Sequence, residues 1–183
     1  MISIFSAICE RIKANPGLFT GKGLEPIQHF DLFKGQYINP EMFQIYLTPA
    51  LFYEYSVTWT DSGKQIQQGT CTVRVHLVTE ILAESSDGSP DQEEALKIFD
   101  FYTLVNCLLH GLETEEFTPL LRKSEEPDLS PTSVYVHIIE YECTVTDTTT
   151  ERMRQYINVQ LDDLEIKRTG EIEPVPTVAK YVL

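Results

Sequence analysis

The chain has 183 residues, a formal net charge of -14 at pH 7 and 42% hydrophobic residues. A chain of this size buries roughly 70% of the surface that it exposes when unfolded, so one core can stabilise it without a disulfide or a structural metal. The negative charge repels nucleic acid and anionic lipid at long range. The composition therefore predicts one globular domain that binds no sequence-specific nucleic acid and no membrane.

The cysteines and the N-terminus point to a reducing compartment. The four cysteines lie far apart in the sequence among apolar residues, and none forms a C-x-x-C pair, which is typical of buried thiols. The N-terminus lacks the basic region, long apolar core and cleavage site of a signal peptide. No apolar run reaches the roughly 18–20 residues of a membrane-spanning helix. We therefore expect folding in the cytoplasm.

The first 42 residues are predicted to form one short helix and a long loop. Apolar residues recur at spacings of three and four from Ile2 to Ile12, which predicts an amphipathic helix that ends near Pro16. Residues 18–42 contain glycine, proline and single aromatic residues without a sustained period. We expect an irregular segment there, which either wraps the domain or becomes ordered against a partner.

A long β-hairpin between Thr48 and Leu82 organises the chain. Apolar and polar residues alternate in both arms, and residues 61–64 (Asp-Ser-Gly-Lys) have the composition of a tight polar turn. Because Pro49 cannot donate to a strand ladder, the first strand is expected to begin just after it. We expect one face of this first arm to pack under the next helix, and that face carries Tyr53, Tyr55, Val57 and Trp59.

The next helix is predicted to run from Pro90 to about His110. Ser89 suits the N-cap, Pro90 suits the first helical position, and Gly111 suits the end of the helix. The apolar residues form two stripes. The first contains Ile98, Phe101, Tyr102, Val105, Leu108, Leu109 and Leu112, and the second contains Leu96, Phe99, Leu104 and Cys107. A helix covered on one side only should be polar on the other, so the second stripe is expected to contact either the first helix or another subunit.

The remainder of the domain is predicted to contain two strands. A short strand over residues 117–123 is followed by an acidic, proline-bounded loop over residues 124–131. Residues 132–147 alternate, with apolar side chains on both faces at the start, as in a central strand. After Thr150, the alternation of Ile157, Val159 and Leu161 indicates a late edge strand or an extended arm.

Together these elements predict an α+β fold. Residues 1–150 are expected to form a single domain, mainly an antiparallel sheet built on the long hairpin and packed by two helices. Residues 151–183 are expected to form a C-terminal strand or extended arm. No internal repeat or low-complexity segment interrupts this organisation.

The residue pattern favours no catalytic or metal site. His76 and Glu80 share a strand face, but about 13 Å separates positions four apart on a strand, so the two cannot bind one ion. His76 could lie opposite Glu142 or His137 in another strand, since the sequence does not fix the register. No G-x-S-x-G elbow, phosphate loop or calcium loop occurs. We predict no catalytic residue, cofactor or metal; an enzyme that uses His76 or His137 is a further alternative.

The order of the elements resembles the tail terminator and tail-completion (neck) proteins of long-tailed bacteriophages and prophages. The similarity covers Met1 to Asp147 and includes three short stretches: residues 49–52 (Pro-Ala-Leu-Phe), 67–69 (Gln-Gln-Gly) and 125–128 (Glu-Glu-Pro-Asp). The segment after Thr150 departs from the compact pattern of the family. The resemblance implies a small α/β protein without catalytic residues, assembled as a hexameric ring that caps the tail tube and faces the head connector.

The resemblance further implies a virion protein that assembles in the bacterial cytoplasm and contacts itself, the tail tube and the head connector. A ring subunit must bury surface on two sides, so we expect contacts on the polar hairpin face and on the second helix stripe. The interface residues expected there are Glu54, Arg74, Glu80, Leu96, Phe99 and Leu104. An acidic channel would let DNA pass without binding. The alternative is a non-enzymatic, acidic interaction module that binds a protein partner through a sheet edge.

Overall fold

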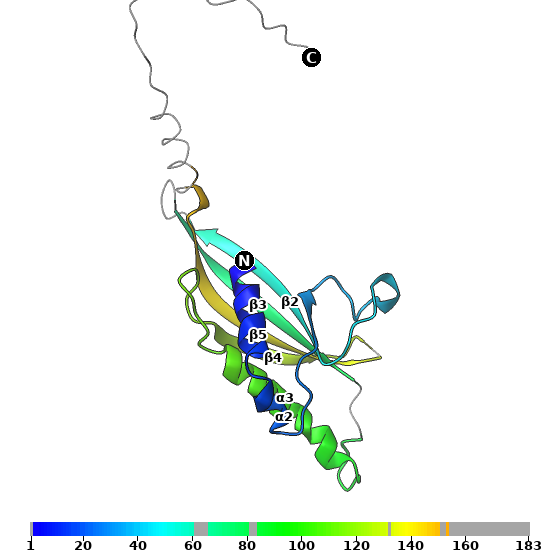
Figure 1. Cartoon of the computed structure of the whole chain (residues 1–183). Helices are drawn as coiled ribbons and strands as arrows, with labels where there is room; N and C mark the ends of the chain where they lie inside the picture. Colours follow the sequence, from blue (N-terminus) through cyan, green and yellow to red (C-terminus); the bar gives the residue numbers. More distant parts are fainter. Residues whose placement is uncertain (1, 61–65, 81–83, 132, 151–152, 154–183) are drawn as a thin grey trace, which may run out of the picture.

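The structure, a computed structural model, describes residues 2–60, 66–80, 84–131, 133–150 and 153. A five-stranded sheet forms its centre, in the order β1-β2-β3-β5-β4 (Figure 1). The strands are β1 (His29–Leu32), β2 (Ala50–Thr60), β3 (Gln67–Thr79), β4 (Leu121–Asp128) and β5 (Tyr135–Asp147). β1 is parallel to β2, and the other neighbouring pairs are antiparallel. The predicted α+β fold with a mainly antiparallel sheet is confirmed.

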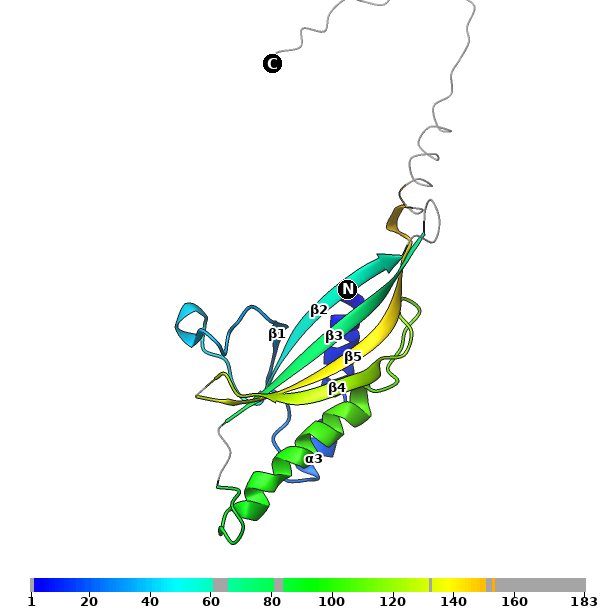
Figure 2. The same ribbon diagram turned by 180° about the vertical axis from the view of Figure 1, so that it is seen from behind.

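Three α-helices in the described part of the chain cover one face of the sheet: α1 (Ile2–Lys13), α2 (Pro16–Thr20) and α3 (Gln92–Leu109). Figure 1 shows α1 in front of the strands, and Figure 2 shows the opposite face, with α1 behind them. α1 packs on β2, where the rings of Phe5 and Tyr53 lie 5.4 Å apart. α3 packs on β5, where Tyr102 stacks on His137 at 3.9 Å. The main core lies between this face and the helices.

The long hairpin is present with the predicted alternation. β2 and β3 pair from Ala50 opposite Val78 to Thr60 opposite Gln68, so the first strand begins directly after Pro49, as predicted. The predicted turn at residues 61–64 lies outside the described residues. The prediction that the first arm packs under α3 is wrong for the end of this arm, where Tyr55 and Trp59 are about half-exposed. The helices cover only the first part of β2, and the helix that contacts β2 there is α1.

The prediction of an irregular segment over residues 18–42 is wrong. This segment contains the end of α2, the strand β1 and a 3-10 helix, η1 (Pro40–Met42). α2 forms because Pro16 suits the first turn of a helix, and its Phe19 is fully buried, with its ring 5.7 Å from that of Phe101. Elements of three to five residues are too short to show a hydrophobic period, which explains why the pattern did not reveal them.

The predicted acidic loop over residues 124–131 is also wrong, because residues up to Asp128 belong to the edge strand β4. The strand begins at Leu121, not at Phe117, which makes an isolated bridge to Val145. β4 is exposed along almost its whole length. Charged residues on one edge strand are compatible with pairing because they remain in water and prevent further strand addition. The composition of β4 is therefore similar to that of an exposed loop, which explains why the sequence predicted a loop here.

The second helix begins slightly later than predicted. Asp91, not Ser89, is the N-cap, and Gln92 is the first helical residue. Gly111 has φ of 81°, the left-handed conformation expected of a residue that follows a helix. The first apolar stripe faces the core as predicted. Of the four cysteines, Cys107 is exposed and the other three are buried thiols.

A smaller apolar cluster lies on the other face of the sheet, near β1. Its buried members are Tyr37, Ala50, Phe52, Val78, Val136 and Ile138. The segment between β1 and β2 supplies Tyr37 and the partly buried Phe33 and Tyr46, so this segment folds over the end of the sheet. The rest of this face, toward Thr60, carries neither a helix nor an apolar cluster among the described residues.

Gly69 lies opposite Trp59 and leaves no space for a side chain. A Cβ atom there would be 2.8 Å from Trp59 Cε3 and 2.9 Å from Val57 Cγ1. We expect Gly69→Val to lower the free energy of unfolding by about 1–3 kcal/mol through overpacking. Urea titrations followed by the fluorescence of Trp59, the only tryptophan, measure this change.

The matched control is Gly17→Ala in α2, where an added Cβ meets nothing within 4 Å. Alanine is favoured over glycine in a helix by about 1 kcal/mol, so this variant is expected to be as stable as the wild type or slightly more stable. Equal stability of Gly69→Val and the wild type would contradict the close approach of Trp59 to Gly69.

Candidate functional site

The part of the second sheet face that the small cluster leaves uncovered is polar throughout. The register places Glu54, Arg74 and Glu140 side by side on β2, β3 and β5, and the next two rows also contain only hydroxyl and carboxylate side chains. These rows are Ser56, Thr72 and Glu142, followed by Thr58, Thr70 and Thr144. We call these nine residues, together with Glu126 of β4, the polar sheet face. The hairpin sequence predicted its first half, and the alternation of Glu140 and Glu142 with apolar residues would have indicated the second.

Arg74 is the only cation among these ten residues, and three carboxylates surround it. Lys123 of β4 reaches the same face, where its Nζ lies 2.9 Å from Oε1 of Glu142. Its guanidinium nitrogens lie 3.7 Å from carboxylate oxygens of Glu54, Glu126 and Glu140. These separations are ion pairs and are too long for hydrogen bonds. The side chains are partly exposed, so water screens the pairs and they contribute little stability. Their effect is on the surface potential, because the carboxylates of Glu54, Glu126, Glu140 and Glu142 outnumber the cations Arg74 and Lys123 on this face.

His76 joins this face to the small apolar cluster and is only 2% exposed. Its Nδ1 lies 2.8 Å from the hydroxyl of Tyr37, and its Nε2 lies 3.1 Å from Oε2 of Glu54. The ring of Phe33 stacks on the imidazole at 4.2 Å. The Tyr37 hydroxyl also lies 3.1 Å from Oδ2 of Asp128. One buried imidazole therefore connects the β1–β2 segment, β2, β3 and, through Tyr37, the end of β4.

The partners of His76 determine which ring nitrogen carries the proton. Burial lowers the pKa of His76, although the hydrogen bond that His76 donates to the Glu54 carboxylate opposes this effect. A neutral ring must then hold its proton on Nε2, because the Glu54 carboxylate can only accept a hydrogen bond. Nδ1 is left to accept the single Tyr37 hydroxyl proton, which in this state is not donated to Asp128. Burial alone would raise the pKa of Asp128, but the hydrogen bonds from Ser130 oppose burial, and the pKa is lowered.

The arrangement around His76 is better suited to holding a chain segment than to catalysis. A hollow of about 560 Å³ lies above it, lined also by Arg74 and Glu126. Both ring nitrogens contact protein groups and Phe33 covers the ring, so no nitrogen faces a substrate. Within the described residues, no group of three or more His, Cys, Asp or Glu side chains could hold a metal ion. The cluster fixes the β1–β2 segment to the sheet.

The register decides between the two pairings left open for His76, and neither occurs. His76 lies opposite Ile138, while His137 lies opposite Leu77. Glu142 lies opposite Thr72. His137 points to the helix side instead, where burial lowers its pKa. Its nearest charged group in the described structure is the Glu125 carboxylate, at 3.9 Å.

The residues predicted as interface residues lie in three places. Glu54 and Arg74 are adjacent on the polar sheet face, whereas Glu80 follows the end of β3 and lines a groove with Lys97 of α3. Leu96 and Phe99 are 46% and 63% exposed on α3, so α1 does not cover them. Leu104 is half-buried against the core and does not belong to this exposed pair.

The outer edge of β2 is open along its second half, which the sequence did not reveal. The Tyr53 carbonyl accepts a hydrogen bond from the Phe33 amide at 2.8 Å, and β1 ends at Leu32, opposite Tyr53. Because N–H and C=O groups of alternate residues point to the same side of a strand, those of Tyr55, Val57 and Trp59 also point outward. No described strand pairs with them.

The sequence comparisons provide no relative whose surfaces could be compared with these. No family model matches the sequence, and no curated protein matches it. Across the described residues, no helix combines the length and the apolar character needed to cross a membrane.

Proposed function

We propose that this protein is a structural assembly protein of a phage virion, similar to a tail terminator. In this proposal, copies of the chain associate into a closed ring, in the bacterial cytoplasm, that caps the tail tube and joins it to the head connector. The protein acts by occupying a position in the assembly and has no catalytic role. We propose this family because of the resemblance in the order of the elements. The physical support for the proposal comes from the surfaces of the fold.

The observation that carries the proposal is that two separate surfaces of one copy have no partner among the described residues. One is the outward side of α3, where Phe99 and Leu96 expose large apolar side chains. The other is the outer edge of β2, where backbone groups of Tyr55 to Trp59 face no described strand. A subunit of a ring needs two different contact surfaces, because each copy meets one neighbour on each side.

The polar sheet face supports the same proposal from its charge. It is uncovered, rich in hydroxyl groups and acidic around Arg74, and the chain as a whole has a net charge of -14. A surface of this kind repels DNA over the Debye length, about 8–10 Å at physiological salt. In our proposal this face lines the channel of the ring, so that DNA passes without being held.

Assembly state tests the proposal directly. Sedimentation and light scattering of the full chain are expected to show a concentration-dependent shift from monomer to one closed species, visible as rings by electron microscopy. Because the copies repel one another electrostatically, added salt should favour the ring. A protein that remains monomeric at all concentrations and salts, alone and with isolated tail tubes, would contradict the proposal.

Phe99→Glu is expected to prevent ring formation, because it places a charge in an apolar contact between subunits. We expect at least a tenfold rise in the concentration needed for half-assembly, from a cost of about 1.4 kcal/mol or more, with little change in the free energy of unfolding. Phe99→Leu is the matched control, since it keeps an apolar side chain and should still assemble. Equal assembly of the two variants would exclude the outward side of α3 from the contact.

A second candidate function is a non-enzymatic interaction module that binds a different protein through a sheet edge. The open edge of β2 favours it, because an extended peptide could pair there through backbone hydrogen bonds. Such a module would remain monomeric without its partner. The assembly measurements therefore separate the two candidates.

A further inference from the structure

We propose that the open edge of β2 receives the C-terminal segment of a neighbouring copy, with residues 156–161 adding a strand beside Tyr55, Val57 and Trp59. The inference rests on the proposed ring and specifies one of its subunit contacts. It requires an edge that accepts a strand, a segment that can form one, and a chain that leaves the domain in the right place.

The accepting edge differs from the outer edge of β4 in the features that prevent strand addition. β4 carries a register irregularity after Arg122, the proline Pro127 and several charged side chains, two of which form the Arg122–Glu125 ion pair at 2.9 Å. Bulges, prolines and charges block the pairing of an edge with another strand. Residues 56–60 of β2 (Ser-Val-Thr-Trp-Thr) contain none of them, and four of the five are good strand formers. The β2 edge therefore lacks the features that block strand addition at β4.

The donor segment matches this edge in pattern and charge. Residues 156–161 (Tyr-Ile-Asn-Val-Gln-Leu) alternate and carry no charge, although charged residues flank them on both sides. Alternation of apolar and polar residues is the pattern of a strand with one buried face. In a chain with a net charge of -14, most pairs of segments would bring like charges together. These two uncharged stretches can pair without that repulsion.

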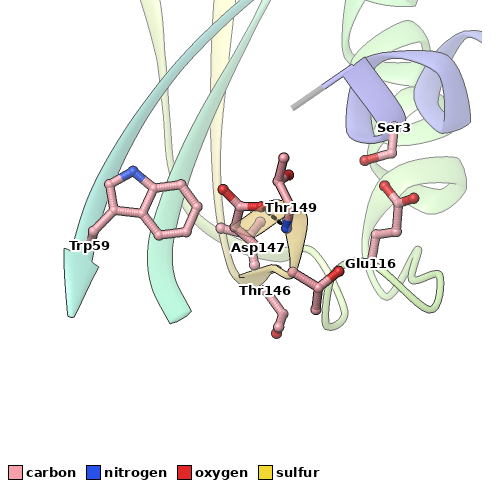
Figure 3. Close-up of a pocket in the computed structure, with 8 residues that line it drawn as sticks. Ser3, Trp59, Glu116, Thr146, Asp147 and Thr149 are labelled. Atoms are coloured by element: carbon pink, nitrogen blue, oxygen red, sulfur yellow. Dashed lines mark hydrogen bonds between the residues drawn. The ribbon is translucent and has the colours of Figure 1, made fainter. Parts of the chain in front are cut away.

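The chain leaves the described domain close to the accepting edge. β5 ends at Asp147, and Thr149 donates its backbone N–H to the Asp147 carboxylate at 2.8 Å (Figure 3). These residues line a hollow of about 290 Å³ together with Trp59, at the end of β2. Residues 154 and 155 separate Met153 from residues 156–161, so at about 3.3 Å per extended residue the donor strand begins within roughly 10 Å of Met153. A neighbour that receives this strand must therefore place its β2 edge close to the end of β5.

A neighbouring copy, not the same copy, is the proposed donor. Figure 1 shows the end of β5 and the end of β2 at the same end of the sheet, so the described chain ends beside the β2 edge that a neighbour would offer. A segment given to one neighbour and an edge filled by the other also form a head-to-tail contact, which is the type that closes a ring.

Hydrogen exchange of the backbone amides of residues 54–60, measured by mass spectrometry on the assembled full chain, tests the proposal. We expect slow exchange in the wild-type ring. Val159→Pro removes an amide and breaks the donor strand, so it should accelerate exchange of Tyr55, Val57 and Trp59 roughly tenfold or more. Thr177→Pro adds a proline to a region that already contains Pro174 and Pro176 and should leave exchange unchanged.

A second variant tests the accepting side. The Val57 amide points away from β3, so Val57→Pro removes an edge donor and leaves the β2–β3 ladder intact. It should reduce assembly to the same extent as Val159→Pro. If Val57→Pro does not fold, Val159→Pro still decides the question, because it changes none of the residues that the structure describes.

Three results would overturn the inference. Rings whose edge amides exchange equally fast in the wild type and in Val159→Pro would leave the proposed function standing and remove this contact. Edge protection that persists in diluted monomers would place the segment on its own copy. A wild-type protein that forms no ring at all would overturn the proposed function together with the inference.

Discussion

Phe19→Ala is expected to lower the free energy of unfolding by about 3–5 kcal/mol, the usual cost of removing a buried phenylalanine ring. The side chain has no exposed surface and its ring lies 5.7 Å from that of Phe101, so the substitution empties the contact between α2 and α3. Since a domain of this size has a stability of about 5–15 kcal/mol, much of it would be lost. The melting temperature should fall by roughly 6–20 °C.

The neighbouring residue supplies the control. Leu18 is in the same short helix but is about half-exposed. Leu18→Ala should therefore change the free energy of unfolding by less than about 1 kcal/mol. Thermal unfolding followed by circular dichroism compares the two variants. Similar losses in both would mean that α2 does not pack on α3 through Phe19.

The two buried histidines are expected to respond oppositely when each is replaced by phenylalanine. His76→Phe should cost about 1–3 kcal/mol at pH 7, because the Tyr37 hydroxyl and the Glu54 carboxylate lose a buried partner. His137→Phe should be neutral or stabilising. Neither ring nitrogen of His137 has a hydrogen-bond partner among the described residues, and its stacking on Tyr102 suits an apolar ring.

The pH dependence follows from the same burial. Desolvation lowers the pKa of both His76 and His137 below the ordinary value of 6.5, so the unfolded chain binds protons more readily than the folded chain. Stability is therefore complete above about pH 6.5 and decreases as the pH falls through the lowered pKa values. Urea titrations between pH 7.5 and pH 5 should show a flatter pH dependence for either variant than for the wild type.

A steeper loss of stability below pH 6.5 in a phenylalanine variant would contradict this assignment. Leu18→Ala is the control, because it removes an exposed side chain without a titratable group. Its pH dependence should match that of the wild type.

Long periodic elements could be predicted from the sequence, and short or charged ones could not. The β2–β3 hairpin, β5, α1 and α3 each contain enough alternating or helical positions to establish a period. α2 and β1 contain five and four residues, so their positions depend on contacts made by residues distant in the sequence, such as Phe19 with Phe101. β4 could not be predicted because its charged residues indicate only that the segment is exposed to water. They do not indicate whether the backbone pairs with another strand.

A candidate surface could be predicted from the sequence where all of its residues belong to one helix or one hairpin. The exposed pair Leu96 and Phe99 and the polar side of the hairpin follow from the patterns of single elements. The cluster around His76 joins Tyr37, Glu54 and Asp128 from separate parts of the chain. The open edge of β2 exists because β1 stops opposite Tyr53, a length that the sequence did not indicate.

The two edge strands also give the sheet an uneven width. β1 pairs only with the first four residues of β2, and β4 pairs with β5 no further than Glu142. The sheet is therefore five strands wide at one end and narrows at the other to β2, β3 and β5, where, within the described chain, residues 116–118 alone bond to the outer side of β5. Narrow ribbons have a larger twist than wide sheets. The twist of these three strands therefore determines the curvature of the surface that the polar sheet face presents.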